Sequence, residues 1–140
     1  MGKLKIGIVG LGRLGMEYAK NISHLVHNAE LFAACSIKKD EIDYVKNKFG
    51  VNNIYDSYDK MLKNKDIDAI VIVSPTDHHA DHIIKAIESG FHVFCEKPLA
   101  ISVSECLRVK NIVDKNRDKT VMLGFVRRYD RSYADAKVKL

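Results

Sequence analysis

Short apolar runs alternate with amphipathic segments along nearly the whole chain, and this alternation constrains the fold more than any other feature. A run that is apolar throughout, such as Ile70–Val73, is typical of a strand covered on both faces. The alternation predicts βαβ units and a parallel sheet. We expect strands at 4–9, 30–36, 69–73, 91–95 and 120–124, with a weak, short one at 53–55. We expect helices at 13–26, 39–49, 58–63, 77–89 and 102–117.

These elements predict the fold class α/β, a Rossmann-type doubly wound parallel sheet in three α/β/α layers. Local signals mark several helix ends. Ser102 and Glu105 have the spacing of a capping box at a helix start. Gly50 and Gly90 fall where C-terminal helix caps belong. The 140 residues are enough for one domain around a single core.

Charge and apolar content exclude several kinds of partner. The net charge of +5 comes from lysines and arginines interleaved with acidic residues, which is typical of solvated helix faces and not of a nucleic-acid surface. No apolar stretch approaches the length of a membrane span, and the N-terminus lacks the apolar core of a signal peptide. An odd number of cysteines in apolar or helical patterns indicates a reducing compartment. They are Cys35, Cys95 and Cys106. We expect a cytoplasmic protein with no nucleic-acid or membrane partner.

The first strand runs directly into a glycine-rich turn with the spacing G-x-G-x-x-G. Gly10 would permit the tight turn, Gly12 would let the backbone approach a pyrophosphate, and Gly15 would let the helix pack against the strand. The helix that begins at Arg13 would present free N–H groups and a positive dipole end to phosphates. We therefore predict a dinucleotide site that also includes Arg13 and Leu14. S-adenosylmethionine, whose fold also begins with a glycine-rich turn, is the alternative ligand.

The residues after the second strand bear on the choice of cofactor. Strict NAD binders place an acidic residue there, which accepts a hydrogen bond from the ribose 2′-hydroxyl. Here the position is occupied by Ser36, which is neutral and can donate to a phosphate. Lys38 and Lys39 could neutralise a 2′-phosphate, and Arg13 could approach the adenine side. These residues favour NADP(H), or dual use leaning towards NADP; the alternative is NAD, with Lys38-Lys39 merely beginning a solvated helix.

A lysine follows the apolar run 91–95, in the sequence Glu96-Lys97-Pro98. Open α/β sheets bind ligands at the carboxyl ends of their strands, and Pro98 pushes Lys97 towards an extended conformation. The Lys97 ammonium could stabilise the alkoxide that develops as hydride leaves a secondary alcohol. Glu96 could pair with that ammonium or position the nicotinamide ribose. Methyltransferase chemistry does not call for this lysine, so we predict an oxidoreductase in which Lys97 is catalytic and binds substrate; the alternative is an exposed loop lysine.

Together, the glycine turn and Glu96-Lys97-Pro98 resemble the glucose–fructose oxidoreductase/inositol dehydrogenase/MocA family of nicotinamide-dependent sugar and polyol dehydrogenases. The resemblance implies that Ser74-Pro75 lies along the cofactor and that His79, four residues after Pro75, opens the next helix in the cofactor site. It also implies a cis Lys97-Pro98 peptide and places Glu96, Lys97 and Pro98 against the cofactor. The segment Gly124–Asp130 is similar to that of the inositol-acting members, which implies that Arg127 borders a polyol pocket.

Two further histidines, His78 and His82, are spaced i, i+4 and could in principle grip a metal ion. Lys85 continues their face and would repel a cation, and no third ligand is evident. We therefore interpret them as part of a solvated helix face and expect no metal.

We expect residues 1–125 to form a dinucleotide-binding domain and residues 126–140 to begin a truncated second domain, because a polar, helix-prone stretch stops there without a cap. The resemblance implies that the proton-transfer pair, an Asp and a His, lies on that second domain. The expected reaction is hydride transfer between NAD(P) and a secondary alcohol of an inositol-like cyclic polyol or sugar, in a full-length homo-oligomer. The chain alone would bind cofactor without turnover. The alternatives are a non-catalytic dinucleotide-sensing module and a family member acting on another sugar or an imine.

Overall fold

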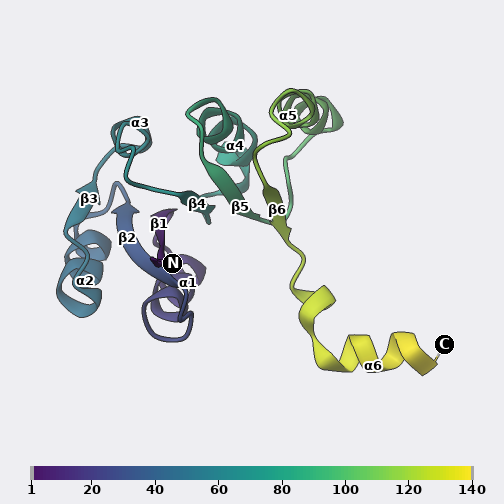
Figure 1. Ribbon diagram of the computed structural model, residues 1–140, viewed down its shortest axis with the longest axis horizontal. Coiled ribbons are helices and arrows are strands. Elements are labelled where there is room, and N and C mark those ends of the chain that lie inside the picture. Colours follow the sequence, from purple (N-terminus) through teal and green to yellow (C-terminus); the bar gives the residue numbers. More distant parts are fainter. Residues whose placement is uncertain (1, 140) are drawn as a thin grey trace.

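A computed structural model describes residues 2–139 and shows a six-stranded sheet in which all neighbouring strands are parallel (Figure 1). The strands are β1 (Leu4–Val9), β2 (Ala29–Cys35), β3 (Asn53–Tyr55), β4 (Ala69–Ile72), β5 (His92–Glu96) and β6 (Val121–Gly124). Their order is β3-β2-β1-β4-β5-β6, so the chain winds outward from β1, crosses back and continues from β4. This doubly wound order places a switch point between β1 and β4. The expected Rossmann-type sheet is confirmed.

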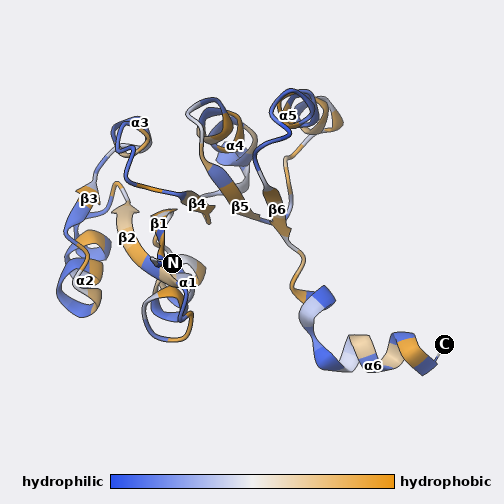
Figure 2. Cartoon of the chain, viewed as in Figure 1, coloured by the Kyte–Doolittle hydropathy of each residue, from blue (hydrophilic) through white to orange (hydrophobic). Residues whose placement is uncertain are grey.

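Helices cover both faces of the sheet and complete the three layers. They are α1 (Arg13–His24), α2 (Lys39–Phe49), α3 (Tyr58–Met61), α4 (His79–Glu88) and α5 (Val103–Lys115). One core cluster takes in Ala19 and Ile22 of α1 with Val45 of α2, and the other takes in residues of α3, α4 and α5. Figure 2 shows hydrophobic residues concentrated on the strands that these helices cover. Within residues 2–139, no helix is long and apolar enough to cross a membrane.

The sequence-based boundaries agree with the structure at β1, β3 and α2 and differ by a few residues at other ends. At the expected helix 77–89, a 3₁₀ turn, η1 (Thr76–His78), precedes α4. Ser102 and Glu105 form the expected capping box. Gly50 ends α2 in the left-handed region at φ 70°, and Gly90 follows α4 at φ 93°. None of the three cysteines is in a disulfide, and two of them, Cys35 and Cys95, are buried.

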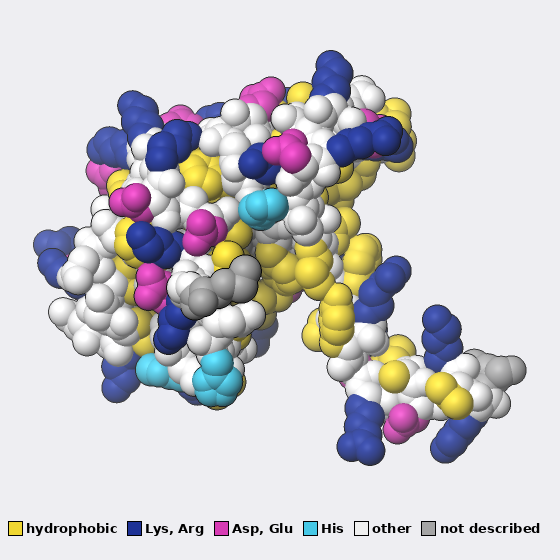
Figure 3. Space-filling view, in the orientation of Figure 1, with side chains coloured by type: hydrophobic (Ala, Val, Ile, Leu, Met, Phe, Trp, Pro, Cys, Tyr) yellow, Lys and Arg dark blue, Asp and Glu magenta, His cyan; other side chains and the backbone are white. Residues whose placement is uncertain are grey.

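The chain beyond the sheet extends away from the body. After β6 come η2 (Val126–Tyr129) and α6 (Arg131–Lys139), which project from the sheet edge in Figure 1. No residue of α6 is buried, and Phe125 and Val126 on the connection are exposed. Figure 3 shows hydrophobic side chains along this connection and lysines and arginines on the extension. The assignment of residues 126–140 to a second domain stays a prediction.

The glycine turn brings three backbone segments into direct contact. Gly10 has φ 88°, and a Cβ there would lie 2.6 Å from backbone atoms of Val73 and Ser74, just after β4. A Cβ on Gly15 would lie 1.9 Å from the carbonyl oxygen of Gly10. Neither contact can be relieved by moving a flexible side chain, because the opposing atoms are backbone. Only glycine at these two positions therefore allows the end of β1, the end of β4 and the start of α1 to approach so closely.

We expect Gly15→Ala to lower the free energy of unfolding by about 2–4 kcal/mol, because the backbone must shift to admit the new methyl group. Urea unfolding followed by far-UV circular dichroism measures this change. Gly2→Ala is the matched control, since a Cβ on Gly2 would meet nothing within 4 Å. A Gly15→Ala variant as stable as Gly2→Ala would contradict the proposed role of this contact.

Candidate dinucleotide and catalytic site

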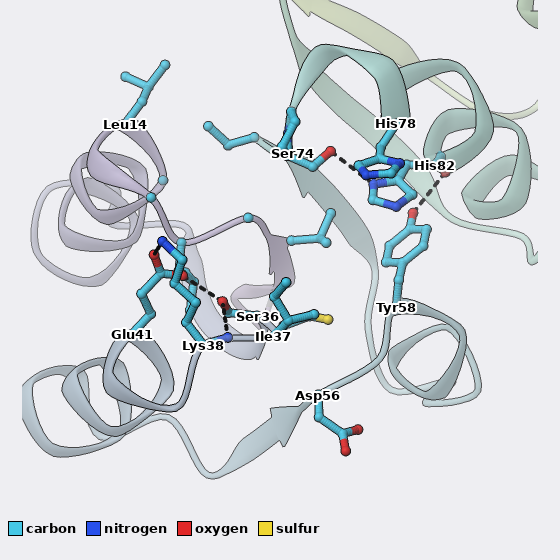
Figure 4. Close-up of a pocket in the computed structure, with 18 of the residues that line it drawn as sticks. Leu14, Ser36, Ile37, Lys38, Glu41, Asp56, Tyr58, Ser74, His78 and His82 are labelled. Carbon is cyan, nitrogen blue, oxygen red and sulfur yellow. Dashed lines mark hydrogen bonds and ion pairs between the residues drawn. The ribbon is translucent and has the colours of Figure 1, made fainter.

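A cavity of about 700 Å³ opens at the carboxyl edge of the sheet, beside the switch point between β1 and β4. Its volume lies in the range of small-molecule sites. Figure 4 shows its walls, which come from the start of α1, the residues after β2 and β4, and helices α2, α3 and α4. Nine of the predicted cofactor residues line it: Gly10, Gly12, Arg13, Leu14, Gly15, Ser36, Lys38, Ser74 and Pro75.

The glycine turn leaves room for a phosphate at the start of α1. A Cβ on Gly12 would meet nothing within 4 Å, so open space lies beside this part of the backbone. Gly12 is also the N-cap of α1, and no side chain caps the helix. The N–H groups of the first turn are thus available to an anion, and the helix dipole favours one there. The residues present fit the pyrophosphate of a dinucleotide.

At the end of β2, Ser36 is engaged in a way that its sequence position did not reveal. Its Oγ donates to Glu41 Oε2 at 2.6 Å and accepts from the Lys38 backbone N–H at 3.1 Å. The expectation that this hydroxyl donates to a 2′-phosphate is not supported, because the hydroxyl donates to a carboxylate. Glu41 also lines the cavity, and the rule that places an acid at the strand end does not point to it.

On the opposite wall, Ser74 is paired with His82 of α4. Ser74 Oγ lies 3.0 Å from His82 Nδ1, and Tyr58 Oη donates to the His82 carbonyl at 2.9 Å. The His78 ring stacks on His82 at 5.5 Å, and both line the cavity (Figure 4). Burial, with a smaller contribution from nearby His78, lowers the pKa of His82 from 6.5 to about 4. In the neutral ring, Nδ1 of His82 can accept a hydrogen bond from the Ser74 hydroxyl.

The interpretation of His78 and His82 as a solvated helix face is therefore wrong for His82, which is half-buried and bonded to Ser74. The i, i+4 spacing correctly placed both histidines on one side of the helix. It could not reveal the contact of His82 with Ser74, because Ser74 lies outside the helix, after β4. Among residues 2–139, no group of three or more His, Cys, Asp or Glu side chains is placed to hold a metal ion.

His79 lies behind the cavity wall. Its ring is buried, with Nε2 2.8 Å from the Ser74 carbonyl oxygen and Nδ1 2.7 Å from the Pro98 carbonyl oxygen. Both partners are backbone carbonyl oxygens, so His79 links two main-chain segments. His79 does not line the cavity, and its expected contact with the cofactor stays a prediction. His79 ties the loop after β4 to the loop after β5.

At the end of β5, a buried carboxylate supports the backbone of Lys97. Glu96 Oε1 accepts from Tyr18 Oη of α1 at 2.5 Å, and Glu96 Oε2 accepts from the Lys97 N–H at 3.1 Å. Burial, reinforced by the Glu96 carboxylate, raises the pKa of the Tyr18 phenol well above its usual value, so Tyr18 remains a donor. The Lys97-Pro98 peptide is cis, which confirms what the family resemblance implies.

Lys97 itself is exposed, and its ammonium has no ion-pair partner among residues 2–139. The expected pairing of the Glu96 carboxylate with this ammonium is therefore wrong, because Glu96 instead binds the backbone of Lys97 and the Tyr18 hydroxyl. Neither Glu96 nor Pro98 lines the cavity; both lie beyond it at the end of β5. Tyr18 was missed because it is 78 residues from Glu96 in the sequence.

Arg127 lies on η2, after β6, at the same edge of the sheet. Its Nη1 donates to Asp130 Oδ2 at 3.0 Å, and its guanidinium lies 4.9 Å from the Tyr133 ring centroid. The ion pair with Arg127 lowers the pKa of the Asp130 carboxyl. Arg127 is exposed and lies outside the cavity, so its expected role in substrate binding stays a prediction.

This chain is similar in sequence and fold to known dehydrogenases. The scyllo-inositol 2-dehydrogenase (NAD(+)) of Bacillus subtilis is 36% identical over 138 residues, which cover 99% of this chain and 40% of that protein. The inositol 2-dehydrogenase of Salmonella typhimurium is 33% identical over 135 residues, which cover 96% of this chain and 40% of that protein. A crystal structure of scyllo-inositol dehydrogenase from Lactobacillus casei with bound NAD(H) and scyllo-inositol superposes on this chain with a TM-score of 0.94. The two are 40% identical, and the match covers 96% of this chain and 40% of that protein.

The chain spans about 40% of the length of these relatives. Residues 4–125 match the GFO_IDH_MocA family model, described as an oxidoreductase family with an NAD-binding Rossmann fold. The match covers the six strands and the cavity they carry. This chain therefore belongs to the glucose–fructose oxidoreductase/inositol dehydrogenase/MocA family of oxidoreductases.

Proposed function

We propose that this chain forms the NAD-binding domain of a cyclic-polyol dehydrogenase, which transfers hydride between NAD and a secondary alcohol of an inositol-like ring. The observation that carries the proposal is the position of two sites on one sheet edge. The glycine-lined cavity lies at the ends of β1 and β4, and Lys97 follows β5 at the same edge. The relative from Lactobacillus casei, 40% identical, binds NAD(H) and scyllo-inositol.

We propose NAD, not NADP, as the cofactor. The preference for NADP(H) rested on a neutral Ser36 where strict NAD binders have an acid, with Lys38, Lys39 and Arg13 nearby. The Ser36 hydroxyl instead donates to an acid, Glu41. The Bacillus subtilis relative is named for NAD(+). In this proposal the glycine turn binds the pyrophosphate, the residues after β2 bind the adenosine ribose, and Ser74 and Pro75 lie along the middle of the cofactor. When bound, NAD would supply the hydride acceptor.

Lys97 would hold the reacting hydroxyl of the substrate. A positive charge at this position stabilises the negative charge that develops on the oxygen as the hydroxyl proton leaves. The Lys97 ammonium is unpaired by any carboxylate among residues 2–139, so its charge is available to a ligand. Glu96 would act as a positioning residue, since it fixes the Lys97 backbone while Tyr18 occupies its other oxygen.

We propose that Arg127 contributes to the polyol pocket and that residues 126–140 begin a second domain that carries the proton-transfer residues. The chain by itself would then bind NAD without oxidising a polyol. We also propose that the full-length protein is a cytoplasmic homo-oligomer. A dinucleotide-sensing module would keep the glycine turn but would have no need of Lys97, and no specific observation favours it.

The first test is dinucleotide binding by the chain. We expect NADH to bind, and Gly12→Ala to weaken binding on the order of tenfold or more, because the new methyl group would point into the space beside the pyrophosphate turn. NADH fluorescence titration measures the affinity. Gly2→Ala is the control and should bind like the parent. A chain that binds no dinucleotide would contradict the proposed function.

The second test addresses Lys97 in a protein that carries this domain together with the second domain. We expect Lys97→Ala to lower kcat for oxidation of scyllo- or myo-inositol by about 10²–10⁴, the usual effect of losing a proton-transfer or charge-stabilising group. Affinity for NADH should change little, because Lys97 lies outside the cavity. Lys119→Ala, in the loop before β6, is the matched charge control. A near-normal kcat in Lys97→Ala would contradict the proposed role and show that Lys97 is an ordinary loop lysine.

The third test uses the half-buried His82–Ser74 pair. Because burial lowers the pKa of His82 from 6.5 to about 4, the unfolded chain takes up this proton at higher pH than the folded chain. The His82 contribution to stability is therefore present above pH 6.5 and is lost progressively as the pH falls towards 4. We expect His82→Asn to lose less stability than the parent between pH 7 and pH 5 in urea unfolding.

The exposed His27 provides the control for this experiment, and His27→Asn should lose as much stability as the parent over the same interval. If His82→Asn and His27→Asn show the same pH dependence, the neutral, buried state of His82 is refuted.

A further inference from the structure

The wall of the cavity after β2 holds one carboxylate, and it comes from a helix and not from the strand end. Glu41 lies in the first turn of α2, lines the cavity, and has a side chain that is only 15% exposed. Figure 4 shows it beside Ser36 and Lys38, across the cavity from Ser74 and His82. In an NAD-binding sheet, the acid that accepts from the ribose 2′-hydroxyl is expected in this region, at the strand end.

The Glu41 carboxylate is fixed in place by Ser36. The Ser36 hydroxyl donates to Oε2 at 2.6 Å, and its oxygen also accepts from the Lys38 backbone N–H at 3.1 Å. Ser36 is itself buried, so this bond forms away from bulk water. The serine at the strand end thus does not replace the missing acid. It orients an acid that stands five residues further along the chain.

One cation, Lys38, lies near the Glu41 carboxylate. Lys38 Nζ lies 3.4 Å from Oε1, but the lysine side chain is 64% exposed, and ion pairs with exposed lysines contribute little. The N-terminus of α2 stabilises negative charge in its first turn. A carboxylate has about four acceptor positions, so Ser36 and Lys38 leave capacity for another donor.

We propose that Glu41, held by Ser36, is the group that accepts the 2′-hydroxyl of the adenosine ribose and disfavours a 2′-phosphate, so that it sets the preference for NAD over NADP. A ribose hydroxyl would donate a charge-assisted hydrogen bond to this carboxylate. A 2′-phosphate offers no such donor in its charged form, and its negative charge would be repelled by a partly buried anion. This inference rests on the proposed function, because it requires a dinucleotide in the cavity.

The experiment measures the affinity of the chain for NADH and for NADPH by fluorescence titration at one fixed ionic strength. The parent should bind NADH at least about tenfold more tightly than NADPH. Glu41→Gln keeps the shape of the side chain and removes its charge, and it should shift the ratio of the two affinities towards NADPH on the order of tenfold to a hundredfold.

Asp40→Asn is the matched control. Asp40 precedes Glu41 in the same helical turn, is exposed, and does not line the cavity. The substitution removes the same charge from the chain as Glu41→Gln does. Because an exposed charge is well screened, it should leave the affinity ratio within about twofold of the parent. Adding Lys38→Ala to Glu41→Gln should reduce the gain in NADPH affinity, because Lys38 is then the nearest cation for the 2′-phosphate.

Ser36→Ala is a second variant in which the carboxylate remains but loses its anchor, and it should lose part of the discrimination, by about threefold to tenfold. Melting temperatures of all variants establish that they are folded. If the parent binds both dinucleotides but Glu41→Gln shifts the ratio no more than Asp40→Asn, the inference is overturned and dinucleotide binding stands. If the parent binds neither dinucleotide, the proposed function itself fails.

Discussion

The contact among Gly10, Gly15 and the backbone after β4 is the constraint on which the rest of the site depends. A single methyl group at Gly10 or Gly15 would meet backbone atoms at 2.6 Å or 1.9 Å. Because no side chain intervenes, the start of α1 approaches the ends of β1 and β4 closely enough to form one wall of the cavity. In the same turn, a Cβ on Gly12 would meet nothing within 4 Å.

Around this contact, buried polar side chains fix the loops that carry function. His79 joins the Ser74 carbonyl to the Pro98 carbonyl, and Glu96 joins Tyr18 of α1 to the backbone of Lys97. Every fully buried side-chain polar atom within residues 2–139 has a hydrogen-bond partner. Leaving such a group without its partner costs more than an average hydrogen bond contributes, so these links are sensitive to single substitutions.

The fold could be predicted from the sequence because hydrophobic periodicity and the glycine spacing are local signals. Nine predicted cofactor residues line the cavity for the same reason, since each belongs to the glycine turn or follows a strand closely in the sequence. What the sequence did not reveal at Ser36, Glu96 and His79 is their hydrogen-bond partners, which depend on packing between elements. Tyr18 and Glu96 are 78 residues apart, and no pattern within a strand or helix links them. Even Glu41, only five residues from Ser36, was missed because the turn into α2 brings the side chains together.

The topology also determines which way round the proposed dinucleotide would lie along the sheet edge. The strand order places the end of β2 on one side of the glycine turn and the ends of β4, β5 and β6 on the other. Glu41 therefore stands at one end of this series and Lys97 towards the other. From β2 to β5 there are three strand spacings, or about 14 Å. A dinucleotide that crosses the glycine turn with its adenosine at Glu41 must extend its other half towards Lys97. The reverse orientation would bring its reactive end to a carboxylate, which cannot stabilise a developing alkoxide.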